Sequence, residues 1–191
     1  NLTSIDQTTD TCTNNFATLN PLFNSAPTYS EGNLEFKNTH ASNSEQGQFT
    51  IAQAFSGKWY YEIKVASSTN NSQYEDFGHP TGYVRTNGTI HPSGSTTVSN
   101  GDIFGFLANY DDGQITIYRN GTQIYQSSSG ITLDDTVGIV GNFNNTIFQT
   151  NFGNPIFSIS SGNSDPAGYG NFEYSTNGGY ALNTKNLAEY G

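Results

Sequence analysis

The stretch GDIFGFLANYDDGQITIYRNGTQIY, residues 101–125, decides the fold of this chain. It contains two dipeptides, Asp112-Gly113 and Asn120-Gly121, each flanked by β-branched and aromatic residues. Such dipeptides tolerate the positive φ angles of tight turns, and they are the strongest short-range signal of a β-hairpin. Ile115 and Ile117 share one face at a period of two, so we expect one face of this stretch to be buried and the other to be half exposed. The stretch therefore predicts three antiparallel strands joined by two tight turns.

Further strands are predicted on both sides of this meander. Residues 58–65 read KWYYEIKV, in which alternate residues from Trp59 to Val65 are apolar or aromatic and predict a strand with one buried side. Shorter strands are predicted at residues 33–37, 48–54, 137–141 and 146–152, a hairpin at 82–90 about Asn87-Gly88, and loops at 66–82 and 94–100.

Turn signals recur about every ten residues, and no sustained 3.6-residue stripe of helix formers occurs. The chain is therefore predicted to be all-β, an antiparallel two-sheet β-sandwich. We expect three segments. Residues 1–30 form an extended N-terminal arm packed on the domain, residues 31–157 form the sandwich, and residues 158–191 are a Gly/Ser/Asn-rich segment with a C-terminal closing strand. The apolar anchors of the arm are Phe16, Leu19, Leu22 and Phe23.

Charge and hydropathy argue against nucleic acid and membranes as partners. The formal net charge is −10, and six Lys and Arg residues offer little with which to neutralise phosphates or anionic lipid headgroups, so no nucleic-acid partner is expected. No window of eighteen apolar residues occurs, so we expect no membrane insertion. The chain begins with Asn and contains no Met, which indicates a processed product or a piece of a longer polypeptide.

The residues that could hold a metal or cofactor do not form a recognisable site, and no cofactor is expected. Cys12 is the only cysteine, which excludes an internal disulfide framework and a thiolate cluster. The acidic turn at residues 111–113 fails the pattern of an EF-hand, because Arg119 would occupy the twelfth position of the loop. A calcium site built from separate loops stays open.

The three histidines are also predicted not to share a metal. If Asn87-Gly88 closes a two-residue turn, His91 pairs with Val84 and His79 lies opposite Thr96. With His40 far away in the sequence, solvated loop histidines are the simpler interpretation.

No arrangement of catalytic residues is apparent, so we expect no enzymatic activity. A retaining glycosidase needs two carboxylates that flank the scissile bond, but Glu62 is alone on the outer face of its strand. Glu75 and Asp76 are adjacent in a predicted loop and so point in different directions. A Gly-x-Ser-x-Gly nucleophile turn and a phosphate-binding glycine loop before a helix are both absent from the sequence.

Recognition by loops remains the best functional hypothesis. Aromatic rings beside carboxylates suit sugars or peptides, because rings stack on the ligand and acids accept its protons. The candidate ligand-binding residues are Tyr74, Asp76, Phe77, His79, Tyr83, Tyr110 and Asp111. The alternatives are that these aromatics cover the core or that they contact neighbouring subunits.

Four motifs, in order and at matching spacing, resemble the SPRY domain: GKWYYE at 57–62, NGDIFG at 100–105, IYRNG at 117–121 and NFG at 151–153. The resemblance covers residues 30–157 and implies a bent, concanavalin-like sandwich. The chain departs from the family at residues 107–112, LANYDD, where the family carries an LDLD-type strand, and in the long segment 158–179.

The flanks TNNFATLNP at 13–21 and GYALNTKNL at 179–187 are similar to those of SPRY-like modules in structural proteins of tailed bacteriophages. This resemblance implies a non-enzymatic structural or adhesion module on a virion, in a tail fibre or as a capsid decoration. Its expected location is the surface of the extracellular particle. The implied partners are other virion proteins and a host surface glycan or protein, with homo-oligomerisation, as a trimer in a fibre. The alternatives are a secreted or cell-surface carbohydrate-binding lectin and a glycosidase fragment.

Overall fold

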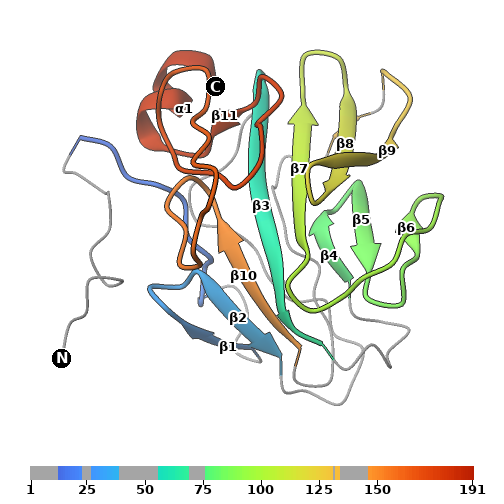
Figure 1. Ribbon diagram of the computed structural model, residues 1–191. Helices are drawn as coiled ribbons and strands as arrows, with labels where there is room; N and C mark the ends of the chain where they lie inside the picture. Colours follow the sequence, from blue (N-terminus) through green and yellow to red (C-terminus); the bar gives the residue numbers. More distant parts are fainter. Residues whose placement is uncertain (1–12, 23–26, 39–55, 69–75, 131, 134–145) are drawn as a thin grey trace, which may run out of the picture.

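The computed structural model describes residues 13–22, 27–38, 56–68, 76–130, 132–133 and 146–191 (Figure 1). The strands are β1 (Pro27–Ser30), β2 (Glu35–Asn38), β3 (Lys58–Ser67), β4 (Asp76–His79), β5 (Gly82–Arg85), β6 (Ile90–His91), β7 (Ile103–Asn109), β8 (Gln114–Arg119), β9 (Thr122–Gln126), β10 (Ile147–Asn151) and β11 (Tyr180–Ala181), and the helix is α1 (Thr184–Tyr190). The strands predicted at 48–54 and 137–141 lie outside the described residues, as do Cys12, Phe23, His40 and Glu75.

The strands form two sheets. The large sheet has the order β1-β2-β10-β3-β7-β8-β9, with antiparallel pairing throughout this path, and β11 pairs with β3 in parallel. The small sheet is β4-β5-β6, also antiparallel, and it packs against β7 and β8. Figure 1 shows the small sheet beside the lower half of β7 and β8, and β1 and β2 at the opposite edge of the large sheet. The predicted antiparallel β-sandwich is therefore confirmed.

The meander predicted from residues 101–125 is present as β7, β8 and β9. Arg119 pairs with Thr122, so Asn120-Gly121 is a two-residue turn, with φ of 48° and 79° as a type I′ hairpin requires. Gly113, with φ of 59°, ends the loop between β7 and β8. Ile115 and Ile117 are both fully buried, which confirms the predicted apolar face.

The main core lies between the two sheets and is rich in aromatic rings. The predicted inner face of β3, from Trp59 to Val65, is buried there against the Phe104 and Phe106 rings of β7. The small sheet closes the other side of this core. Gly78 of β4 lies so close to β7 that a Cβ atom at this position would meet the Phe106 ring, and its φ is 125°. The glycine therefore permits the close approach of the two sheets.

The opposite face of the large sheet is covered by the C-terminal segment, a cover that was not predicted. Residues 158–179 resemble a linker in composition, but their Phe172 is fully buried against Tyr60 of β3, with ring centroids 5.3 Å apart. Glu62 lies on the outer face of β3, away from the main core, and is completely buried beneath this segment. Sequence composition does not reveal such cover, because a few well-placed rings are enough to pack a polar segment onto a sheet.

Glu62 accepts four hydrogen bonds, two of which hold the C-terminal segment onto it. Its carboxylate accepts from the backbone N–H of Glu173 (3.1 Å) and of Tyr174 (2.9 Å), from Asn151 Nδ2 (2.9 Å) and from the Tyr60 hydroxyl (3.3 Å). Burial raises the pKa of Glu62, while these four bonds act to lower it.

The described ends of the chain lie together. Ala17 N donates to Leu182 O (2.9 Å) and Thr184 N donates to Asn15 O (3.0 Å), so the arm runs antiparallel to the residues before α1. Phe16 and Leu19 are buried as predicted, but Leu22 is 92% exposed and anchors nothing. β1 lies within the segment predicted as an arm and pairs with β2.

Helix α1 was not predicted. Its N-cap is Asn183, whose side chain accepts from Asn186 N (2.9 Å). The helix has seven residues, which is too short for a recognisable 3.6-residue stripe. No helix among the described residues has the length and hydropathy that a membrane crossing needs.

Candidate binding surface

Most of the predicted loop residues have structural roles. Asp76 lies in β4, not in a loop, and is 7% exposed. Its carboxylate accepts from Arg85 Nε (2.5 Å) and Nη2 (2.9 Å) in a bidentate ion pair across β4 and β5. Phe77 is fully buried in the main core, 4.9 Å from the Phe104 ring centroid. For Phe77 the alternative of core packing is therefore confirmed.

His79 and Tyr110 do come together, but beneath the surface. His79 is fully buried, and its Nδ1 accepts from Thr81 N (3.1 Å), so Nε2 carries the proton and faces the Tyr110 hydroxyl at 3.5 Å. The Tyr110 side chain is half buried. This pair fixes the turn after β4 against the end of β7, and it offers a ligand little exposed surface.

The hairpin of β5 and β6 differs by one residue from the prediction. Arg85 N donates to Thr89 O (2.8 Å), so the turn has three residues and His91 pairs with Tyr83, not Val84. The Tyr83 and His91 rings stack with centroids 4.5 Å apart. His79 pairs with Gly82, so the predicted placement opposite Thr96 was also wrong. Tyr74 lies outside the described residues.

Asp111 is the predicted residue that reaches an open hollow. This hollow, which we call the aromatic groove, has a volume of about 410 Å³. Its lining residues come from the start of β3, the β7–β8 turn, the start of β11 and the end of α1. They are Ser56, Gly57, Lys58, Asp111, Gly178, Tyr180 and Tyr190. The volume lies within the range of about 300–1,000 Å³ that is typical of small-ligand sites.

Two stacked tyrosines form one wall of the aromatic groove. The rings of Tyr180 and Tyr190 lie 3.9 Å apart between centroids and 11° from parallel. Tyr180 is placed by its parallel pairing with Trp59, and Tyr190 ends α1. The Trp59 ring lies behind Tyr180, at 6.3 Å, and donates from Nε1 to Ser56 O (2.7 Å). The tyrosine wall is therefore supported by the core.

The opposite part of the aromatic groove carries charge. Asp111 is exposed, and its Oδ1 accepts from Gly57 N (2.7 Å), which fixes the carboxylate over the start of β3. Lys58 lines the same groove. A carboxylate, an ammonium group and aromatic faces in one hollow can hold a ligand that carries both hydroxyl groups and an apolar ring face.

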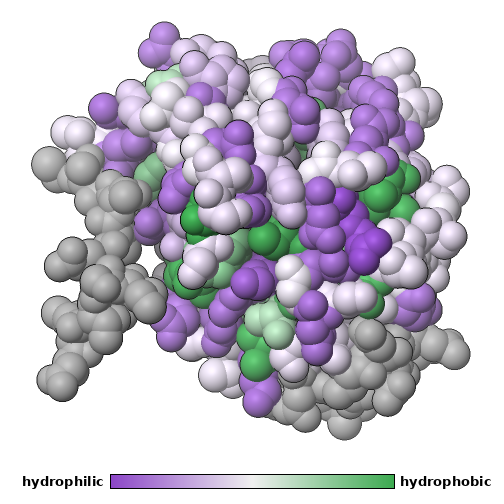
Figure 2. Space-filling model, viewed as in Figure 1, coloured by the Kyte–Doolittle hydropathy of each residue, from purple (hydrophilic) through white to green (hydrophobic). Residues whose placement is uncertain are grey.

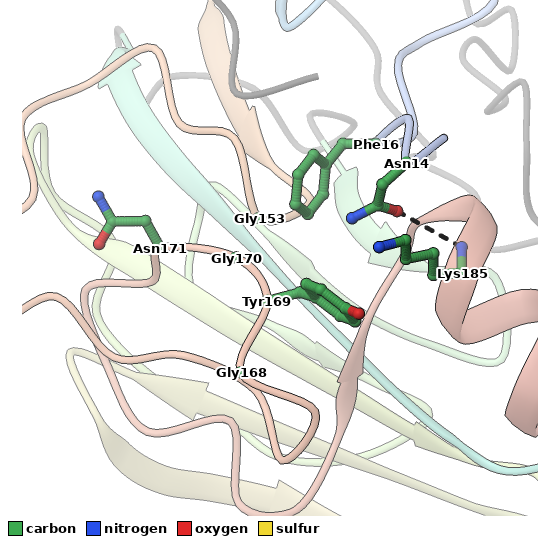
Figure 3. A pocket seen from close by; sticks show the side chains of 8 residues that line it. All are labelled: Asn14, Phe16, Gly153, Gly168, Tyr169, Gly170, Asn171 and Lys185. Atoms are coloured by element: carbon green, nitrogen blue, oxygen red, sulfur yellow. Dashed lines mark hydrogen bonds between the residues drawn. The ribbon is translucent and has the colours of Figure 1, made fainter. Parts of the chain in front are cut away.

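Two further hollows lie beside the first turns of α1. One, of about 300 Å³, is lined by Asn14, Phe16, Gly153, Gly168, Tyr169, Gly170, Asn171 and Lys185. Figure 3 shows Asn14, Tyr169 and Lys185 gathered on one side of it, whereas the Asn171 amide points away from them. The other, of about 460 Å³, is lined by Ala167, Tyr169, Lys185, Asn186, Ala188, Glu189 and Tyr190. The region over α1, at the upper left of Figure 2, is mostly hydrophilic.

The tyrosines of the C-terminal segment were not predicted to take part in the site. Tyr169, Tyr174 and Tyr180 interrupt a run of Gly, Ser and Asn, and aromatic residues at this density are unusual in a linker. That density was the available signal. Among the described residues no three His, Cys, Asp or Glu side chains are grouped as a metal ion would need.

Comparison with solved structures identifies the fold. The SPRY domain of human HERC1 superposes with a TM-score of 0.52 and 10% sequence identity, covering 69% of this chain and 96% of that domain. The PSpry domain of TRIM65 superposes with a TM-score of 0.52 and 12% identity, covering 71% of this chain and 92% of that domain. No protein-family model and no curated protein matches the sequence. The chain therefore has a SPRY-like, concanavalin-like antiparallel β-sandwich fold.

Proposed function

We propose that this protein is a non-enzymatic binding module that attaches to its partner through the aromatic groove. The observation that carries the proposal is the placement of exposed Asp111 in one hollow with Lys58 and the stacked rings of Tyr180 and Tyr190. Rigid rings supply contact area with little loss of side-chain entropy, and the two charges supply hydrogen bonds that orient the ligand.

We further propose that the module belongs to a virus particle, as a structural or adhesion protein of a tail fibre or capsid appendage. The flanks at 13–21 and 179–187 support this role through their resemblance to phage structural modules. Its partners would be neighbouring virion proteins and a glycan or protein of the host surface. The second candidate is a secreted or cell-surface lectin, which the tyrosine rings beside Asp111 favour equally.

Binding through the aromatic groove is tested with Asp111→Asn and a matched control. The purified protein is titrated against a glycan array and against intact host cells. Asp111→Asn is expected to weaken binding about tenfold, since hydrogen bonds to a charged group are worth about 1.5–3 kcal/mol. Asp112→Asn is the control, because Asp112 is also exposed and lies outside the groove. Equal binding by both variants would remove the groove from the proposal.

The virion role is tested separately by immunogold electron microscopy of particles from the native source. Gold at a fixed place on the particles supports it. Labelling of secreted material or cell envelopes, with bare particles, supports the lectin. Turnover of any polysaccharide by the purified protein would contradict the non-enzymatic assignment.

A further inference from the structure

The three hollows are linked through shared residues. Tyr169 and Lys185 line both hollows beside the start of α1, and Tyr190 lines both the second hollow and the aromatic groove. Hollows that share a wall residue are neighbours. The three therefore form a row beside α1, from Gly153 to Asp111, which we call the helix cleft.

We propose that the helix cleft binds a neutral, linear oligosaccharide several units long. This inference rests on the proposed binding function. A single sugar would fill only one of the three hollows, whose volumes are about 300, 460 and 410 Å³. A linear chain can occupy consecutive hollows, and its affinity then increases with the number of hollows filled.

Aromatic rings recur along the helix cleft. Tyr169 is half buried between the first two hollows, with Lys185 Nζ 5.3 Å from its ring centroid. Tyr190 is half buried between the second hollow and the groove, stacked on Tyr180. Sugar units present apolar C–H faces at regular intervals, and rings placed at successive hollows suit that repeat.

The middle hollow contains a side chain with an unused acceptor. Asn186 is 1% exposed, and its Nδ2 donates to Asp165 Oδ2 (2.6 Å) and Ala181 O (2.8 Å), which fixes the orientation of the amide. Its Oδ1 is buried and accepts no hydrogen bond from the described residues. A buried acceptor without a donor is costly, and a sugar hydroxyl would satisfy it where binding shifts the wall of the hollow enough to uncover this atom.

The charges favour a neutral ligand over an acidic one. Lys185 and Glu189 both line the middle hollow, and a hydroxyl group can accept from the first and donate to the second. The cleft itself is balanced, with Glu189 and Asp111 against Lys185 and Lys58. An acidic polysaccharide would therefore gain no net attraction there and would meet a net charge of −10 on the whole chain.

The lining also favours a sugar over a peptide. Peptide recognition depends on apolar or aromatic anchors that fill deep hydrophobic pockets. The walls here are mainly glycines, amides and charged groups around tyrosine rings. Their apolar residues are Phe16, which is 6% exposed, Ala167 and Ala188, and the only large apolar side chain exposed among the described residues is Leu22, which lines none of the three hollows.

The test measures how affinity depends on the length of the sugar. The full chain is titrated calorimetrically with neutral linear oligosaccharides of glucose, mannose and galactose, from monosaccharide to hexasaccharide. Affinity is expected to rise by about tenfold or more between one unit and four, as further hollows are occupied. Added salt is expected to change this affinity little, and oligomers of galacturonic acid are expected to bind more weakly than their neutral counterparts.

Two variants locate the sugar in the helix cleft. Tyr169→Ala and Lys185→Ala are expected to weaken hexasaccharide binding about tenfold and to leave monosaccharide binding in the aromatic groove unchanged. Tyr118→Ala is the control for the first, because Tyr118 packs on the same core cluster as Tyr169 but lines none of the hollows. Lys64→Ala is the control for the second, because Lys64 also lies over a ring, that of Phe157, at 5.2 Å.

Each other outcome contradicts the inference in its own way. Affinity that is independent of length and of Tyr169 and Lys185, but sensitive to Asp111, leaves the aromatic groove as a small site and removes the helix cleft. Preference for the acidic oligomers, with strong salt dependence, refutes the neutral ligand. If no sugar binds but members of a peptide library do, the inference about sugars is wrong and the proposed binding function stands. If Asp111→Asn then leaves peptide binding unchanged, the assignment of binding to the aromatic groove is wrong as well.

Discussion

Replacing Glu62 by Ala is predicted to destabilise the protein by about 2–4 kcal/mol. The backbone N–H groups of Glu173 and Tyr174 would lose their acceptor, and an orphaned buried donor costs about 1–3 kcal/mol. Removing the carboxylate also removes the cost of burying a charge that has no cationic partner, since in the described part of the chain neither ion pair includes Glu62. This gain offsets part of the loss in stability. The C-terminal segment would then be held less firmly to the sheet.

Equilibrium urea unfolding, followed by the fluorescence of the buried Trp59, measures this loss. Each kcal/mol is expected to lower the Tm by about 2–4 °C for a chain of this size. Hydrogen exchange at the amides of residues 173 and 174 provides a local measure, and both should lose protection. Glu35→Ala is the control, because Glu35 is a half-buried carboxylate of β2 that also accepts hydrogen bonds, from Ser30 and Gln149.

Glu62→Gln removes the titration of Glu62 and keeps one of its two acceptor oxygens. Burial raises the pKa of Glu62 above its ordinary value, so the folded protein holds this proton at a higher pH than the unfolded chain does. The stabilisation that results is complete below the ordinary pKa and is lost as the pH rises through the raised one. Glu62→Gln should lack this slope, and it should also be destabilised, because each carboxylate oxygen accepts from a backbone N–H and the new NH2 group would face one of those donors. A wild-type stability that increases with pH relative to that of Glu62→Gln would refute the reasoning.

Three further substitutions test the fold. Trp59→Ala is predicted to cost about 3–5 kcal/mol through the cavity left in the core, and a Tm unchanged from wild type would show that Trp59 is exposed. Gly78→Ala should be clearly destabilising, because the new Cβ meets the Phe106 ring at a φ of 125°; thermal melting that matches Gly101→Ala, where no atom lies within 4 Å, would contradict the close sheet packing. Asn183→Ala should cost about 0.5–2 kcal/mol by removing the cap of α1, measured by urea unfolding, and no loss would mean that the cap is unimportant.

The fold was predictable where local pattern determines structure. The strands around Trp59 and Ile117 carry a period of two, and Asn120-Gly121 fixes the register of its own turn, so neighbouring residues contain the whole signal. β4 was assigned to a loop because the residues before it are polar and Phe77 is the only large apolar residue among its four. Asp76 becomes buried through its ion pair with Arg85, which a local pattern does not encode.

The candidate site was predicted only in part, for a related reason. Asp111 was identified because an acid beside an aromatic residue in a turn indicates recognition. Its partners Tyr180 and Tyr190 are distant in the sequence. Tyr180 reaches the groove through the parallel pairing of β11 with β3, and Tyr190 reaches it from the end of α1. The residues predicted near Asp76 proved to be structural. Their residue types are the same as those of the aromatic groove, since aromatic rings serve both a core and a binding surface.

The antiparallel contact between Asn15–Ala17 and Leu182–Thr184 has a mechanical consequence. In this arrangement the chain before Asn15 and the chain after Thr184 leave the pair at the same end. Tension applied between those two points would peel the hydrogen bonds apart one after another instead of loading them all in shear. Force applied there would load the contact between the N-terminal arm and the start of α1 first, while the hydrogen bonds of Asn186 to Asp165 and Ala181 would still hold the helix. The ends of the chain would therefore separate before the sandwich unfolds.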